Sequence, residues 1–121
     1  MNLLPSWLNR SRRPTFSRTT ERYSCAIDGS LMMIDRIINF PGRVIDLSTG
    51  GALFRPRLTY LLHRRDVPIC LTIGSHELFG RIMGTNPLGF GLSFDEPLEE
   101  GEFRAILALS NVPVIAATRA A

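Results

Sequence analysis

Apolar residues alternate with polar or small residues in several short segments between residues 22 and 94, a pattern typical of β-strands with one face in a core. The clearest segment places Val67, Ile69, Leu71 and Ile73 on one face. The alternation predicts strands over residues 22–27, 31–38, 43–46, 52–55, 67–73, 78–84 and 90–94. Short strands at this spacing predict a small antiparallel sheet or barrel.

Turn-forming residues separate these segments. Four dipeptides are predicted to form the turns: Asp28-Gly29, Pro41-Gly42, Gly74-Ser75 and Asn86-Pro87. Residues 56–66 do not alternate, and their arginines together with the following Pro68 predict an extended connection.

The pattern changes after Asp95, where apolar residues recur at a spacing near 3.6 and carboxylates crowd the start of the segment. Acidic side chains complement the dipole at a helix N-terminus, so we predict one helix over residues 98–110, with Gly101 as its weak point. The tail, residues 112–121, is apolar and small, and either packs on the barrel or frays.

The N-terminal segment has its own pattern. Leu4, Trp7 and Leu8 share a helical spacing after Pro5, which a first helical turn tolerates, so a short helix and a frayed end are both open. Residues 9–17 are predicted to form a basic loop. If the helix forms, Trp7 needs an apolar cover, which the barrel, another protein or a second copy in a homodimer could supply.

A length of 121 residues and a hydrophobic fraction of 45% predict one soluble globular domain. All 14 basic residues are arginine, and the net charge is +3. The first 22 residues hold five arginines and one glutamate, so this arm alone carries +4. A basic arm on a near-neutral body indicates an anionic partner, such as nucleic acid, an acidic lipid or a phosphorylated small molecule.

The remaining reactive residue types suggest neither a metal site nor catalysis. Cys25 and Cys70 lack close spacing and predict buried, reduced thiols, as expected of a cytoplasmic protein. His63 and His76 lie in polar, loop-like stretches and are predicted to be surface residues. The sequence shows no Ser-His-Asp or Cys-His arrangement that could form a catalytic site, so we expect that the protein is not an enzyme. No apolar run approaches the ~18 residues that a membrane-spanning helix needs.

Two short motifs remain. Residues 46–51 read Asp-Leu-Ser-Thr-Gly-Gly between two apolar runs, which a tight turn alone would explain. Upstream, Arg18 and Arg22 lie four residues apart at the start of the first strand, where solvated surface charge is the simplest interpretation. Together, however, RxxxR followed by DxSxxG resembles the PilZ domain, over about residues 12–109.

The resemblance implies a six-stranded antiparallel β-barrel with one C-terminal helix. We expect this unit over residues 18–111, with a basic arm over residues 1–17 and a tail over residues 112–121. It also implies cyclic di-GMP as the ligand and no other cofactor, because PilZ domains typically bind this second messenger. The positions that match the family's motifs are Arg18, Arg22, Asp46, Ser48 and Gly51.

Ser17 stands where some relatives carry a further arginine, and Arg12 and Arg13 lie close enough in sequence to compensate. We therefore include Arg13 among the candidate ligand-binding residues. Whether one ligand or an intercalated pair binds is open at this point.

These residue types suit the two phosphates and two guanines of the ligand. An arginine fork binds phosphate through paired hydrogen bonds and stacks on purines. The Asp46 carboxylate can accept hydrogen bonds from a guanine edge, Ser48 can donate or accept, and Gly51 allows close backbone approach. We expect residues 10–20 to become ordered on binding, as in an adaptor.

The sequence thus predicts a cytoplasmic cyclic di-GMP receptor that signals to an unidentified downstream protein. A binding-deficient PilZ-like interaction module is one alternative. The other is a small β-barrel nucleic-acid-binding protein that uses the arginine arm. Nucleic acid is disfavoured, because such barrels stack bases on exposed rings and most aromatic residues here occupy core-like positions.

Overall fold

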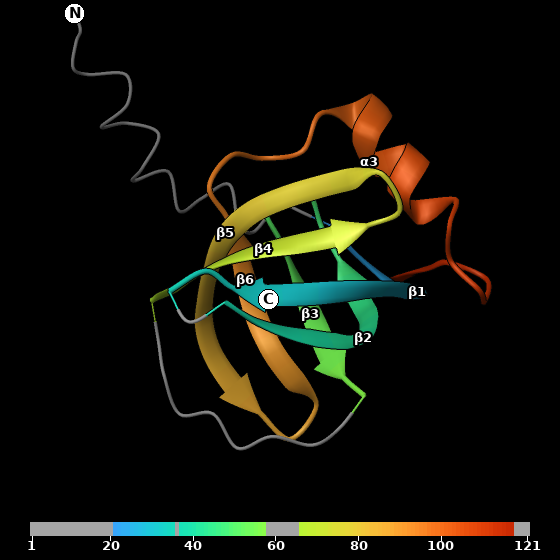
Figure 1. Ribbon diagram of the computed structural model, residues 1–121. Helices are drawn as coiled ribbons and strands as arrows, with labels where there is room; N and C mark the ends of the chain where they lie inside the picture. The colour runs from blue at the N-terminus through green and yellow to red at the C-terminus, as the bar shows by residue number, and fades with distance from the viewer. Residues whose placement is uncertain (1–20, 36, 58–65, 118–121) are drawn as a thin grey trace, which may run out of the picture.

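The computed structural model describes residues 21–35, 37–57 and 66–117. Within them, six antiparallel strands follow the order β2-β3-β6-β5-β4-β1, and pairing of β1 with β2 closes the barrel (Figure 1). The strands are β1 (Arg22–Met33), β2 (Ile38–Leu47), β3 (Gly51–Pro56), β4 (Val67–Ile73), β5 (His76–Asn86) and β6 (Gly89–Phe94). This arrangement confirms the predicted mainly β barrel.

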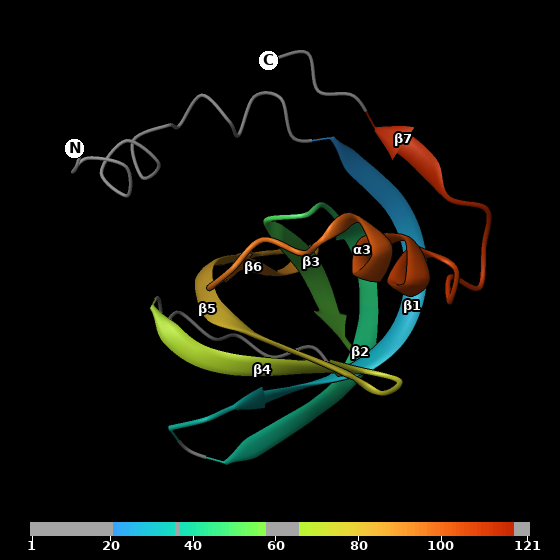
Figure 2. The same cartoon turned by 90° about the horizontal axis from the view of Figure 1, so that it is seen from above.

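Helix α3 (Glu100–Leu107) lies at one end of the barrel and confirms the single predicted helix, although it is shorter at both ends than predicted. Gly101 lies inside it and does not break it. A seventh strand, β7 (Ile115–Ala117), lies outside the barrel and pairs with the first residues of β1 (Figure 2). Part of the tail therefore packs on the sheet.

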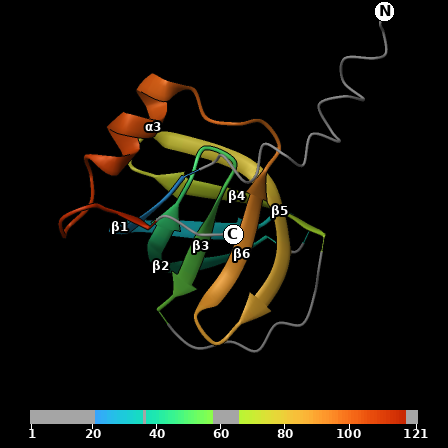
Figure 3. The same ribbon diagram turned by 180° about the vertical axis from the view of Figure 1, so that it is seen from behind.

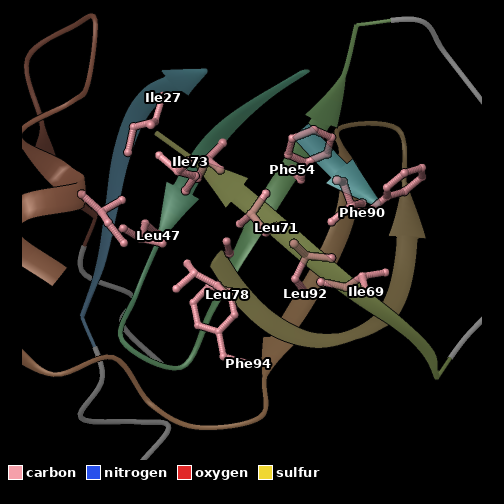
Figure 4. Close-up of a cluster of buried hydrophobic side chains, with 14 of the residues drawn as sticks. Ile27, Leu47, Phe54, Ile69, Leu71, Ile73, Leu78, Phe90, Leu92 and Phe94 are labelled. Carbon is pink, nitrogen blue, oxygen red and sulfur yellow. The ribbon is translucent and has the colours of Figure 1, made fainter. Parts of the chain in front are cut away.

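The barrel interior is filled by the alternating residues that the sequence pattern selects. Val67, Ile69, Leu71 and Ile73 are all at most 1% exposed. Side chains from different strands point toward one another in the interior, among them Phe54 of β3, Leu71 of β4 and Leu92 of β6 (Figure 4). The view from behind shows β3, β6 and β5 next to one another in the barrel wall (Figure 3). Phe103 and Ile106 of α3 join the same core cluster.

Two of the predicted turns are wrong, and so are the strand ends that were predicted on either side of them. Asp28-Gly29 lies inside β1 and Pro41-Gly42 lies inside β2. The chain instead reverses between Met33 and Ile38, where Ile37 has a φ of 52°. This left-handed conformation is rare for a β-branched residue. No glycine, proline or asparagine marks the reversal, so the sequence pattern could not locate it.

The two misassigned glycines serve strand packing instead. Gly29 and Gly42 are directly paired across β1 and β2. A Cβ on Gly29 would lie 2.8 Å from the carbonyl oxygen of Thr72, and one on Gly42 would lie 2.3 Å from that of Arg55. Both glycines are therefore needed because neighbouring backbones approach closely.

The other two predicted turns are confirmed. Gly74 has a φ of 59° between β4 and β5, and β5 ends at Asn86 as expected. Predictions for residues 1–20 and 58–65, including His63, lie outside the described residues. In the part of the chain that is described, no helix is long and apolar enough to cross a membrane.

Candidate functional site

The two sequence motifs meet at one contact between the start of β1 and the end of β2. Arg22 Nε donates a hydrogen bond to Asp46 Oδ2 at 3.2 Å. The two side chains are 39% and 24% exposed, so the pair lies at the surface, within reach of a ligand. Antiparallel pairing of β1 with β2 brings these residues together although 24 positions separate them.

Irregular strand pairing surrounds this contact. The register of β1 against β2 shifts between Ser24 and Ile27. The register of β2 against β3 shifts between Val44 and Asp46. Such bulges bend a strand and re-aim its side chains, and they are over-represented next to functional sites. Asp46 is paired with Ser24 on one side and Leu53 on the other, and a register shift lies directly beside it in both ladders.

The second carboxylate oxygen of Asp46 has an unusual environment. Asp46 Oδ1 is buried and has no hydrogen-bond partner among the described residues. An unsatisfied buried oxygen of this kind is destabilising until a donor reaches it. Among the described residues, the Asp46 carboxylate is thus only half satisfied, through the contact of Oδ2 with Arg22.

Cys25 lies close to this carboxylate. Burial, with a smaller contribution from the Asp46 charge, raises the pKa of the Cys25 thiol to about 11. Cys25 and Cys70 are both buried and free, as predicted. Cys25 is therefore a neutral thiol near neutral pH and not a reactive thiolate.

Ser48 is the first residue of the turn between β2 and β3 and is only 4% exposed. Its Oγ accepts hydrogen bonds from the backbone N–H groups of Gly50 and Gly51, at 3.3 and 3.2 Å. The hydroxyl donates to the carbonyl oxygen of Gly51 at 3.3 Å. These contacts give Ser48 a structural task, which is to hold the turn that follows Asp46.

Gly51 also has a structural task. A Cβ at this position would lie 2.2 Å from the carbonyl oxygen of Leu92 on β6, so only glycine allows β3 and β6 to pair here. The same turn holds the chain that leads into α3, because Gly50 and Thr49 accept hydrogen bonds from the backbone N–H groups of Phe94 and Leu98. The turn therefore ties Asp46 to the rest of the barrel.

The remaining candidates lie elsewhere. Arg18 and Arg13 are outside the described residues. His76 is half-buried and lies 3.3 Å from Glu102, so it joins β5 to α3 instead of standing free on the surface. Within the described residues, no group of histidine, cysteine and carboxylate side chains could hold a metal ion.

Comparison with known proteins identifies the domain type. The family model of the PilZ domain matches residues 16–111, which include both motifs, the whole barrel and α3. No curated protein matches the chain.

Proposed function

Because the chain belongs to the PilZ domain family, a family of binding and adaptor domains that generally bind cyclic di-GMP, we propose that it is a cyclic di-GMP receptor. The observation that carries this proposal is the contact between Arg22 and Asp46 at 3.2 Å. One residue of each family motif takes part in it. Two motifs that lie 24 residues apart in the sequence thus supply one side chain each to one surface contact.

The chemistry of the contact suits this ligand. Arg22 uses Nε to bind Asp46, so the terminal nitrogens of its guanidinium can bind a phosphate and its plane can stack on a guanine. The Asp46 carboxylate accepts hydrogen bonds from the edge of a guanine. The guanine N1–H and amino group are donors of the kind that Asp46 Oδ1 lacks. Arg18 supplies the second arginine of the motif, and Arg13 compensates for Ser17.

Ser48 and Gly51 support the site indirectly. In this proposal they shape the turn behind Asp46, since the hydroxyl of Ser48 is already bonded within the turn and Gly51 packs against β6. The receptor acts in the cytoplasm as an adaptor without catalytic activity, and the occupied site signals to a downstream protein.

Calorimetric titration of the full chain with cyclic di-GMP tests the proposal. Wild type should bind, and Asp46→Leu, which removes the acceptor, should weaken binding at least about tenfold, as loss of a charge-assisted hydrogen bond does. Arg104→Ala is the matched control, because Arg104 lies on the exposed face of α3 and pairs with Glu100. Wild-type protein that shows no heat of binding at saturating ligand would overturn the proposal.

The nucleic-acid alternative has little support among the described residues. The aromatic rings of Phe40, Phe54, Phe90 and Phe94 are buried, and Phe79 is the one exposed phenylalanine in the described chain. A barrel that binds single strands needs several exposed rings on which bases can stack. A single-stranded oligonucleotide is therefore the negative control of the same titration.

A further inference from the structure

Strand β1 has two edges, and the edge away from β2 is completed by three different segments. Near its start it pairs with β7, over Arg22–Ser24. Near its end it pairs with β4, over Ser30–Met33. Buried backbone polar groups between these two stretches need other partners. The chain that connects α3 to β7 supplies them, and Figure 2 shows both elements beside β1.

The gap is filled at Ala26. Its N–H donates a hydrogen bond to Ser110 Oγ at 3.0 Å, and its carbonyl oxygen accepts one from the N–H of Asn111 at 2.7 Å. Ala26 is buried and lies in the bulge where β1 loses its register with β2. Ser110 and Asn111 therefore supply the hydrogen-bond partners of Ala26 on the edge away from β2. Ala26 lies at the position where the register of β1 against β2 shifts.

The hydroxyl of Ser110 is used fully. It donates to the carbonyl oxygen of Val112 at 2.7 Å, which leaves its lone pairs for Ala26 N–H and, at 3.3 Å, for Val112 N–H. An alanine at this position would leave the buried N–H of Ala26 without its acceptor. Such a loss is more damaging than the loss of an exposed hydrogen bond.

Ala26 lies close to the candidate site. Ser24 of β1 is paired with Asp46 of β2, and Arg22 lies two residues before Ser24 on β1. The ring of Tyr23 also packs edge-on against Phe103 of α3, with ring centres 5.6 Å apart. Arg22 thus leaves the barrel four residues before Ala26, at the paired end of the same strand.

We propose that Ser110 is a positioning residue for the ligand site: by binding Ala26 it fixes the bulge in β1 and so aims Arg22 at Asp46. The effect on ligand affinity rests on the proposed function, whereas the effect on the Arg22–Asp46 contact does not. Coupling between two sites is reciprocal. Ligand bound at Arg22 must therefore also stabilise the bond between Ser110 and Ala26.

Titration of four full-length variants with cyclic di-GMP tests the affinity. Ser110→Ala should weaken binding about three- to tenfold, the range that one lost hydrogen bond corresponds to. Ser110→Thr keeps the hydroxyl and should restore wild-type affinity. Asn111→Ala removes only an exposed side-chain contact with Asp28 and keeps the backbone bond, so it should bind like wild type, as should Ser75→Ala. Equal affinities for Ser110→Ala and wild type would overturn the proposal.

A second measurement uses ligand-free protein and separates this proposal from the proposed function. In NMR spectra, Ser110→Ala should speed hydrogen exchange at Ala26 N–H and shift the Nε–H signal of Arg22. If exchange at Ala26 increases while the Arg22 signal stays at its wild-type position, Ser110 is structural only and the proposal fails. Wild-type protein that does not bind cyclic di-GMP would overturn the proposed function, and the Arg22 signal would still decide this one.

Discussion

Two halves of the barrel, one formed by β4, β5 and β6 and the other by β1 and β2, differ in how regularly their strands pair. Strands β4, β5 and β6 form the more regular half: a glycine with a φ of 59° turns the chain between the first two, and the register shifts once, between Ile82 and Gly84. In the other half, the register of β2 shifts against both of its neighbours, β1 and β3, and the chain reverses between β1 and β2 through Ile37 at a φ of 52°. Arg22 and Asp46 lie in this irregular half. Both halves contribute side chains to the core, and the two register shifts of β2 lie beside the side chains that can bind a ligand.

The largest expected effect is in the regular half. Leu71 is fully buried on β4, and Leu71→Ala should lower the free energy of unfolding by about 2–5 kcal/mol, measured by chemical denaturation. At low temperature, the fraction that remains folded should bind cyclic di-GMP with nearly wild-type affinity, since Leu71 lies in the core and the Arg22–Asp46 pair lies at the surface. Affinity that falls in step with stability would mean that the two halves do not act separately.

The two glycines of the turn provide a matched pair for the second prediction. Gly51→Ala should destabilise the protein by about 3 kcal/mol, because its Cβ would meet the carbonyl oxygen of Leu92 at 2.2 Å and neither backbone can move freely. Gly50→Ala should be nearly neutral, since nothing lies within 4 Å of the added carbon. Thermal melts of both variants check this difference, and equal melting temperatures would contradict it.

These cases show what the sequence can and cannot predict. Alternation depends on neighbours within one strand, so it located β3, β4, β5 and β6 and their inward faces. Gly29 and Gly42 look like turn residues, because their need for glycine comes from Thr72 and Arg55 on other strands. Only the folded chain brings those partners near.

The site shows the same division. Family motifs identified Arg22 and Asp46, and the structure brings them together. Ser110 carries no such signal, because a serine after a helix is common and its partner, Ala26, is 84 residues away. The sequence pattern also did not indicate that Ser48 is buried, at 4% exposure, with its hydroxyl bonded to Gly50 and Gly51.

The third prediction separates charge from geometry at Arg22. If its fork binds the ligand, Arg22→Lys keeps the charge but loses paired hydrogen bonds and stacking. Its affinity for cyclic di-GMP should then fall nearly as far as that of Arg22→Ala, by about 1.5–3 kcal/mol in calorimetric titration. Asp46→Asn, which keeps an acceptor, should bind better than Asp46→Leu. A lysine variant with wild-type affinity would show that Arg22 contributes only its positive charge.

The smallest expected effect is a pH dependence in the irregular half. The pKa of Cys25 is raised from 9.0 to about 11, chiefly because burial disfavours the thiolate. A group whose pKa is raised on folding stabilises the protein below its unfolded pKa, and this stabilisation is lost as the pH rises from 9 to 11. At pH 10 the loss from Cys25 amounts to about 1 kcal/mol. The free energy of unfolding of wild type should therefore fall between pH 7.5 and pH 10 by about that much more than the free energy of unfolding of Cys25→Ala. Both proteins retain Cys70 and Tyr23, so the difference between their two slopes isolates Cys25, and parallel slopes would remove it as the cause.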